Sequence, residues 1–161
     1  MGLFNRKKRE IPFVKPKNNC ADKLSTLNVL PKDFDFSTME EIEVSLSEEL
    51  EGVVKAYDIN YEDAEGDFDS LSITEKENGK RELFAIQVNR GEKSLRDLVD
   101  KYCDTLGDPQ GVYSKFHKTD LMMMQDYDAM EMRDWRFSDY TICIGYNLRD
   151  AEVYFVRITE L

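Results

Sequence analysis

The sequence predicts an α+β fold: a single domain with a mainly antiparallel sheet of about five to six strands and two helices packed on one face. Three observations carry this prediction. They are a hairpin signal in the middle of the chain, an amphipathic helix that follows it, and three closely spaced strands at the C-terminus. The order helix, hairpin, helix, meander suits an antiparallel sheet that is covered on one side.

The hairpin is predicted from two segments, about 67–75 and 81–89, that are rich in strand-forming residues and flank Asn78 and Gly79. Both of these residues tolerate positive φ, which a type I′ turn requires at its two central positions.

A helix is predicted over 93–106, with Ser94 as the candidate N-cap and Gly107 and Pro109 as the end signal. Its apolar face recurs at helical spacing and consists of Leu95, Leu98, Val99, Tyr102 and Leu106.

Three strands close the chain, about 128–137, 139–147 and 151–159. Short turns at 138–139 and 147–150 join them into a meander. The middle strand has one strongly apolar face, against which we expect the helix to pack: Tyr140, Ile142 and Ile144.

The segment 37–58 is ambiguous. Ser37 and Glu40 match a capping box, and apolar residues recur at helical spacing as far as Tyr57. Residues 40–46 also alternate as a strand would, so that stretch stays open, whereas we expect a helix over 47–58.

The remaining stretches between elements carry weaker signals. We expect an acidic loop at 59–66, a short strand at 111–118 and a loop at 119–127.

Charge divides the chain in two. Residues 1–18 carry six basic side chains and one acidic one, whereas the other 143 residues carry 16 basic and 32 acidic side chains. We therefore predict a basic, disordered arm and connector over 1–24 and a single acidic domain over 25–161.

The acidic body argues against nucleic-acid binding, because neutralising phosphates requires clustered Lys and Arg. No apolar run approaches the ~18–20 residues that span a bilayer, and no secretory signal is present. Cys20, Cys103 and Cys143 form neither a disulfide framework nor a zinc motif. The opening MGLF followed by Lys and Arg resembles the start of many small bacterial cytoplasmic proteins, and we expect a cytoplasmic protein without a cofactor.

The basic arm has three interpretations. It is a solvated tail, it makes weak, salt-sensitive contact with an anionic membrane surface or an acidic partner, or it folds back on the acidic body of its own chain. The side chains for such a contact are Leu3, Phe4, Arg6, Lys7, Lys8 and Arg9.

Acidic and amide side chains alternate between Asp58 and Asp69, which would suit Ca²⁺. The EF-hand pattern fails here, because Asp63 stands where the loop requires glycine. We therefore expect a solvated loop and no metal site.

A candidate protein-binding surface combines soft and aromatic side chains: Met122, Met123, Met124, Trp135 and Arg136. The alternative is that the methionines and Trp135 fill the core while the arginines Arg133 and Arg136 extend to water. Cu(I) binding by the thioethers lacks a supporting Cys or His nearby.

No catalytic motif stands out. The single histidine, His117, has no recognisable nucleophile beside it, and no glycine-rich phosphate loop occurs. The sequence therefore predicts a non-enzymatic protein-interaction module, of immunity, inhibitor or adaptor type, whose acidic surface meets a basic protein. The alternative is a small carboxylate-dependent enzyme or a small-ligand-binding domain.

Overall fold

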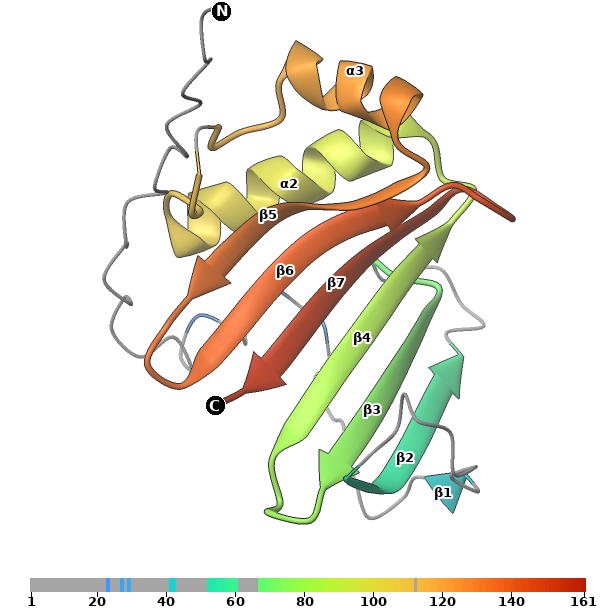
Figure 1. Cartoon of the computed structure of the whole chain (residues 1–161), viewed down its shortest axis with the longest axis vertical. Helices are drawn as coiled ribbons and strands as arrows, with labels where there is room; N and C mark the ends of the chain where they lie inside the picture. The colour runs from blue at the N-terminus through green and yellow to red at the C-terminus, as the bar shows by residue number, and fades with distance from the viewer. Residues whose placement is uncertain are drawn as a thin grey trace, which may run out of the picture.

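The fold is an antiparallel sheet with two helices on one face (Figure 1). The computed structural model describes residues 23, 27, 29, 41–42, 52–60, 67–111 and 113–161. In this part of the chain, seven strands form one sheet in the order β1-β2-β3-β4-β7-β6-β5. The strands are β1 (Glu41–Ile42), β2 (Val53–Asn60), β3 (Ser70–Lys76), β4 (Arg81–Val88), β5 (Ala129–Arg136), β6 (Tyr140–Asn147) and β7 (Val153–Glu160). The helices are α2 (Glu92–Leu106) and α3 (Lys118–Asp126).

The predicted α+β class is confirmed. Six strands have seven or eight residues, and the edge strand β1 adds only two. The hairpin β3–β4 and the meander β5–β6–β7 both form, and β4 pairs with β7 to join them. That pair brings Ala85 opposite Val156, so the two locally built units become one continuous sheet.

The core lies between the sheet and the helices. Ile142, Ile144 and Tyr146 of β6 are fully buried on the helix-facing side. Trp135 of β5 is 1% exposed; its ring lies 6.2 Å from that of Tyr102 on α2, and its indole N–H donates to the Gly107 carbonyl at 2.8 Å. Burying each such large side chain contributes roughly 1.5–3 kcal/mol.

Helix α2 forms as its apolar pattern predicts, and all five residues of the predicted face are buried. Its N-cap is Gly91 rather than Ser94, and no side chain caps it. The Ser94 hydroxyl instead donates to the Gln87 side chain at 3.0 Å, which ties the helix to β4. Gly107 ends the helix with φ 82°, as a C-terminal glycine can.

The hairpin turn differs in type from the prediction. Gly79 has φ 78°, but Asn78 does not adopt positive φ. The Gly79 N–H donates to the Lys76 carbonyl and the Lys76 N–H to the Lys80 carbonyl. This is a three-residue hairpin loop with glycine in the left-handed position. Such a loop needs one residue with positive φ, whereas a type I′ turn needs two.

The predicted helix over 47–58 is wrong where the structure describes it, because Val53–Asn60 is strand β2. Its register with β3 places Tyr57 opposite Ile73 and Ile59 opposite Leu71. A β-branched segment that finds a strand partner gains ladder hydrogen bonds and a buried face, and these override weak helical spacing. In the open stretch 40–46, Glu41–Ile42 is strand and the other residues lie outside the described part.

The predictions for 111–118 and 119–127 are also wrong. Among the described residues of 111–118 there is no strand, and the strand-like pairing next to this segment is a single bridge between Gln110 and Asp134. The expected loop is helix α3. The apolar residues of α3 are consecutive and lack the three- and four-residue spacing of an amphipathic helix. Tertiary contacts, rather than a local sequence pattern, therefore stabilise this helix.

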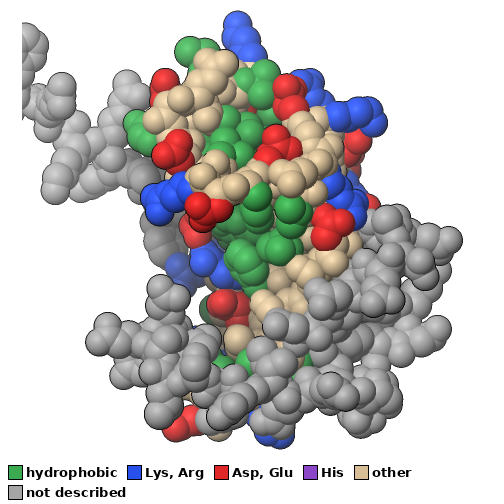
Figure 2. All heavy atoms as spheres, turned by 90° about the vertical axis from the view of Figure 1, so that its right-hand side faces the viewer, with side chains coloured by type: hydrophobic (Ala, Val, Ile, Leu, Met, Phe, Trp, Pro, Cys, Tyr) green, Lys and Arg blue, Asp and Glu red, His purple; other side chains and the backbone are tan. Residues whose placement is uncertain are grey.

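The face of the sheet that points away from the helices, here called the outer face, carries a stacked pair of rings. Phe84 and Phe155 lie 5.2 Å apart. Position 145 of β6, under the Phe155 ring, must be glycine, because a Cβ there would overlap this ring and the Met130 carbonyl. On the side of the molecule where α3 ends and α2 begins, acidic and basic side chains are interspersed around hydrophobic ones (Figure 2). Neither described helix combines the length and apolar composition needed to cross a bilayer.

Candidate interaction surface on helix α3

Helix α3 begins with a capping box that involves the single histidine. His117 Nδ1 accepts a hydrogen bond from the Thr119 N–H at 3.2 Å, and the Asp120 carboxylate accepts one from the His117 N–H at 2.7 Å. The imidazole also stacks on Tyr113 at 4.9 Å. His117 therefore holds the start of α3 in place, because it satisfies amide groups that a helix leaves unpaired.

A buried ion pair fixes α3 to the sheet. Arg133 of β5 is 4% exposed and Asp120 of α3 is 6% exposed. Their side chains form two hydrogen bonds, Nη1 to Oδ1 at 2.9 Å and Nη2 to Oδ2 at 2.8 Å. The expectation that Arg133 reaches water is therefore wrong.

The guanidinium of Arg133 also organises the loop before α3. Nε donates to the Ser114 carbonyl at 2.8 Å, Nη2 to the Lys115 carbonyl at 3.0 Å, and Nη1 to the Met132 carbonyl at 3.0 Å. With the two bonds to Asp120, all five of its N–H groups are used. Such full pairing offsets the cost of burying the charges.

The apolar residues of α3 do not all face the sheet. Leu121, Met122, Met123 and Met124 are consecutive, and at about 100° per residue they extend around about 300° of the helix. Met124 packs against the core, Met123 lines a cavity described below, and Met122 is 59% exposed. One apolar side chain therefore has to point outward.

Two aromatic side chains near α3 are exposed as well. Tyr113 precedes the helix and is 42% exposed, and Tyr127 follows it directly and is 55% exposed. We call Tyr113, Met122 and Tyr127 the α3 surface. Among the described residues, the other exposed large hydrophobic side chains are Val88 and Leu161.

The five predicted protein-binding residues separate into different environments. Met122 is exposed, while Met123 and Met124 are partly buried. Trp135 is in the core, and Arg136 is exposed and lines a pocket on the outer face. The predicted contact residues of the arm, from Leu3 to Arg9, lie outside the described part of the chain.

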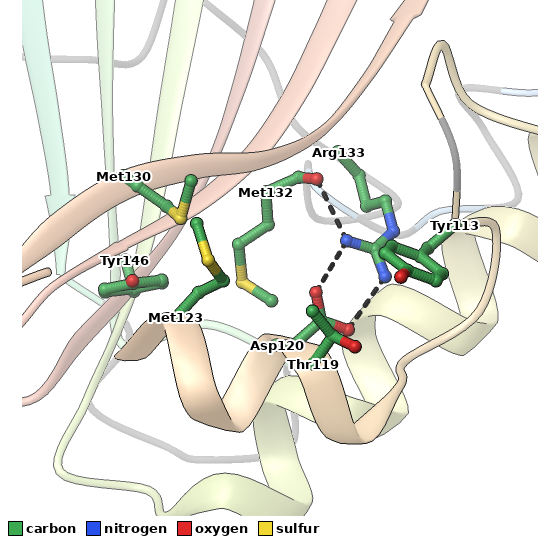
Figure 3. Close-up of a pocket in the computed structure, with 8 residues that line it drawn as sticks. All are labelled: Tyr113, Thr119, Asp120, Met123, Met130, Met132, Arg133 and Tyr146. Atoms are coloured by element: carbon green, nitrogen blue, oxygen red, sulfur yellow. Dashed lines mark hydrogen bonds and ion pairs between the residues drawn. The ribbon is translucent and has the colours of Figure 1, made fainter. Parts of the chain in front are cut away.

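Beneath α3 lies a cavity of about 190 Å³ (Figure 3). It is bounded by α3, by the strands β5 and β6, and by the loop before α3. Its lining residues are Tyr113, Thr119, Asp120, Met123, Met130, Met132, Arg133 and Tyr146. The thioether side chains occupy its middle, with Tyr146 at one end and the Arg133–Asp120 pair with Tyr113 at the other.

A second pocket, of about 230 Å³, lies on the outer face. Its carboxylates are Glu131, which pairs with Arg157, and Asp134. Partial burial raises the pKa of Asp134, and the charge of Glu131 raises it further. Burial raises the pKa of the Cys143 thiol to about 12, so that group stays protonated near neutral pH, whereas nucleophilic attack needs the thiolate.

Two acidic side chains of the predicted acidic segment, Asp67 and Asp69, form ion pairs. Asp69 bonds Arg90 at 2.7 Å, and this contact lowers the pKa of its carboxyl. Asp67 pairs with Lys101 of α2, which also approaches the carbonyl of the buried Leu27. The structure, where it describes the chain, holds no group of three or more His, Cys, Asp or Glu side chains that could bind a metal.

Comparison with known proteins returns no relative. No family model matches the chain. Neither the curated proteins nor the solved structures yield a significant match.

Sequence reasoning missed the tyrosines of this region: Tyr113, Tyr127 and Tyr146. Tyr113 precedes the expected loop at 119–127, and Tyr127 is its last residue. Aromatic residues at both ends of a Met-rich segment are a signal that could have indicated an exposed apolar surface.

Proposed function

We propose that this protein is a non-enzymatic protein-interaction module that binds its partner through the α3 surface. The observation that carries the proposal is that three of the five exposed large hydrophobic side chains of the described chain lie on α3 or beside its ends. Tyr and Met are enriched at protein interfaces, and exposed apolar side chains that gather in one region mark interaction sites, whereas isolated ones do not.

The construction of α3 supports this proposal. Asp120 is the only buried residue of this helix, all of whose residues the structure describes. The helix is held by its cap and its ion pair, so the outward side of α3 contributes little to the core. The exposed, flexible thioether of Met122 can adapt to a partner while the base of the helix remains fixed.

Charge favours a basic partner. Asp126 and Asp128 are exposed and flank Tyr127, and the whole chain has a net charge of −11. Two exposed carboxylates beside Tyr127 accelerate association with a basic protein and add salt dependence. An immunity protein, an inhibitor or an adaptor would use such a surface.

The proposal is tested by comparing Met122→Gln with Leu161→Gln. Both changes remove an exposed apolar side chain, but only the first is on the α3 surface. Tagged full-length protein is used for capture from native lysate at low and moderate salt. We expect one near-stoichiometric partner, released as salt rises, whose affinity falls about fivefold or more in Met122→Gln and is unchanged in Leu161→Gln.

Both variants should retain the thermal stability of the parent, since exposed substitutions usually change it by less than about 0.5 kcal/mol. Equal partner binding by the two variants, or no partner at either salt concentration, would contradict the proposal.

A further inference from the structure

We propose that the cavity beneath α3 binds a small, uncharged, mainly apolar molecule of one or two rings that accepts a hydrogen bond from the hydroxyl of Tyr146. This inference goes beyond the proposed function, because the cavity lies on the sheet-facing side of α3 and shares only Tyr113 with the α3 surface; Met122 and Tyr127 are not among its lining residues.

Size sets the first limit on the ligand. The cavity measures about 190 Å³ and is partly open to solvent. An apolar protein cavity of about 150 Å³ is enough to bind benzene. A substituted single ring or a compact bicyclic molecule therefore fits, and a nucleotide or a sugar chain does not.

The walls favour an apolar ligand. Met123 comes from α3, while Met130 and Met132 come from β5, and Figure 3 shows their thioether groups directed toward one another. Thioethers are polarizable, rotate easily and make favourable contacts with aromatic rings. These three side chains can adjust around a ring that enters between helix and sheet.

The charged groups of the lining favour a neutral ligand. Arg133 and Asp120 neutralise each other, and every N–H of Arg133 already has an acceptor. The Asp120 carboxylate also accepts the His117 N–H. A charged ligand would have to break this network to find a counterion.

One polar group in the lining is unused. The Tyr146 side chain is fully buried, and its hydroxyl has no hydrogen-bond partner among the described residues. Burial raises its pKa, and the nearby Asp120 raises it further, so the hydroxyl remains a donor at neutral pH. A buried hydroxyl without a partner is unfavourable. The hydroxyl is closed off from the cavity in this structure, so a ligand with an acceptor at this end satisfies it once the flexible thioether side chains beside it have shifted.

The test uses three probes of similar size: acetophenone, whose carbonyl accepts a hydrogen bond; α-methylstyrene, which has a CH₂ in place of that oxygen; and benzoate, which is charged. Full-length protein with ¹³C-labelled methionine methyl groups is titrated and followed by NMR. We expect the methyl signals of Met123, Met130 and Met132 to shift with the two neutral probes. The signal of Met122 should stay in place, and benzoate should bind at least tenfold more weakly than acetophenone.

Tyr146→Phe removes only the unpaired hydroxyl and should leave the fold intact. We expect this variant to change the ratio of the acetophenone and α-methylstyrene affinities about fivefold, which is the effect of one ordinary hydrogen bond. Met123→Trp fills the cavity from α3 and should abolish the shifts of Met130 and Met132.

The inference is overturned by any of four results: no shift of the three cavity methionines with any probe, benzoate binding as tight as acetophenone binding, an unchanged affinity ratio in Tyr146→Phe, or persistent shifts of Met130 and Met132 in Met123→Trp. Because Met122→Gln should leave all these titrations unchanged, failure here is distinguishable from failure of the proposed protein interaction.

Discussion

The two helices pack on the same face of one sheet but depend on different forces. Helix α2 has fifteen residues, six of which are buried, and no side-chain cap. Helix α3 has nine residues, one of which is buried, and a complete capping box. Burial of an amphipathic face stabilises α2, whereas α3 depends on hydrogen bonds and on one buried ion pair.

This difference shows how α3 can carry exposed apolar side chains, on which the proposed binding surface rests. Isolated helices shorter than about 12–15 residues are marginal in water, so a helix of nine residues needs external support. Asp120 supplies it twice, by accepting from the His117 N–H and by pairing with Arg133. Because these two interactions hold α3 in place, the side chains on its outward side are free to serve a role other than folding.

The largest expected effect comes from Leu98→Asp in α2. Leu98 is 3% exposed and faces the core, so the change buries an unpaired charge. We expect loss of most of the ~5–15 kcal/mol that stabilises a domain of this kind, and loss of both helices together. Circular dichroism during thermal unfolding measures this. Leu98→Met is the control and should cost less than about 1.5 kcal/mol; equal stability of Leu98→Asp and the parent would show that α2 is wrongly oriented.

An intermediate effect is expected from Arg133→Met, which leaves the Asp120 carboxylate buried without its partner. Breaking a buried pair from one side costs about 3–5 kcal/mol. Because Arg133 also holds the carbonyls of Ser114 and Lys115, we expect the loss to be concentrated in α3. Hydrogen exchange should show fast-exchanging α3 amides while the amides of α2 remain protected.

The matched control adds Asp120→Asn to Arg133→Met, which removes the unpaired charge and keeps an amide oxygen for the cap. The double variant should recover part of the lost free energy. If α2 and α3 lost protection to the same extent in Arg133→Met, the conclusion that the two helices depend on different forces would be wrong.

The smallest effect is expected from His117→Ala, which removes the acceptor for the Thr119 N–H. Loss of an N-cap side chain costs about 1 kcal/mol. His117→Asn keeps an acceptor at this position and should be near neutral. Denaturant unfolding of both variants measures the difference, and similar losses for Ala and Asn would mean that stacking on Tyr113, rather than capping, is the main role of His117.

Much of the fold could be predicted because its signals are local. Helix α2, the hairpin β3–β4 and the meander β5–β7 each combine a periodic apolar pattern with a turn signal close by. Strand β2 could not be predicted, because its apolar spacing fits a helix and its partner β3 lies beyond a loop with no tight hairpin signal such as Asn-Gly. Helix α3 could not be predicted because its main stabilising partner, Arg133, lies outside the helix, on strand β5.

The candidate site was predicted only in part. Composition pointed to the methionines around Met122, but it also grouped them with Trp135, which the structure places in the core. In α3, the helical rotation places Met122 on a different side from Met123 and Met124. The predicted loop gave no reason to expect this separation. The cavity and the unpaired hydroxyl of Tyr146 depend on three elements that meet only after folding.

The sequence by itself determined the α+β class, the position of α2 and the antiparallel units around it, because residue spacing and turn chemistry act over a few residues. The tertiary structure alone decided the strand identity of β2, the existence of α3, the burial of Arg133 and the cavity with its tyrosine. Each of these depends on a partner distant along the chain, such as β3 for β2 and Arg133 for Asp120, and no local pattern specifies such a partner.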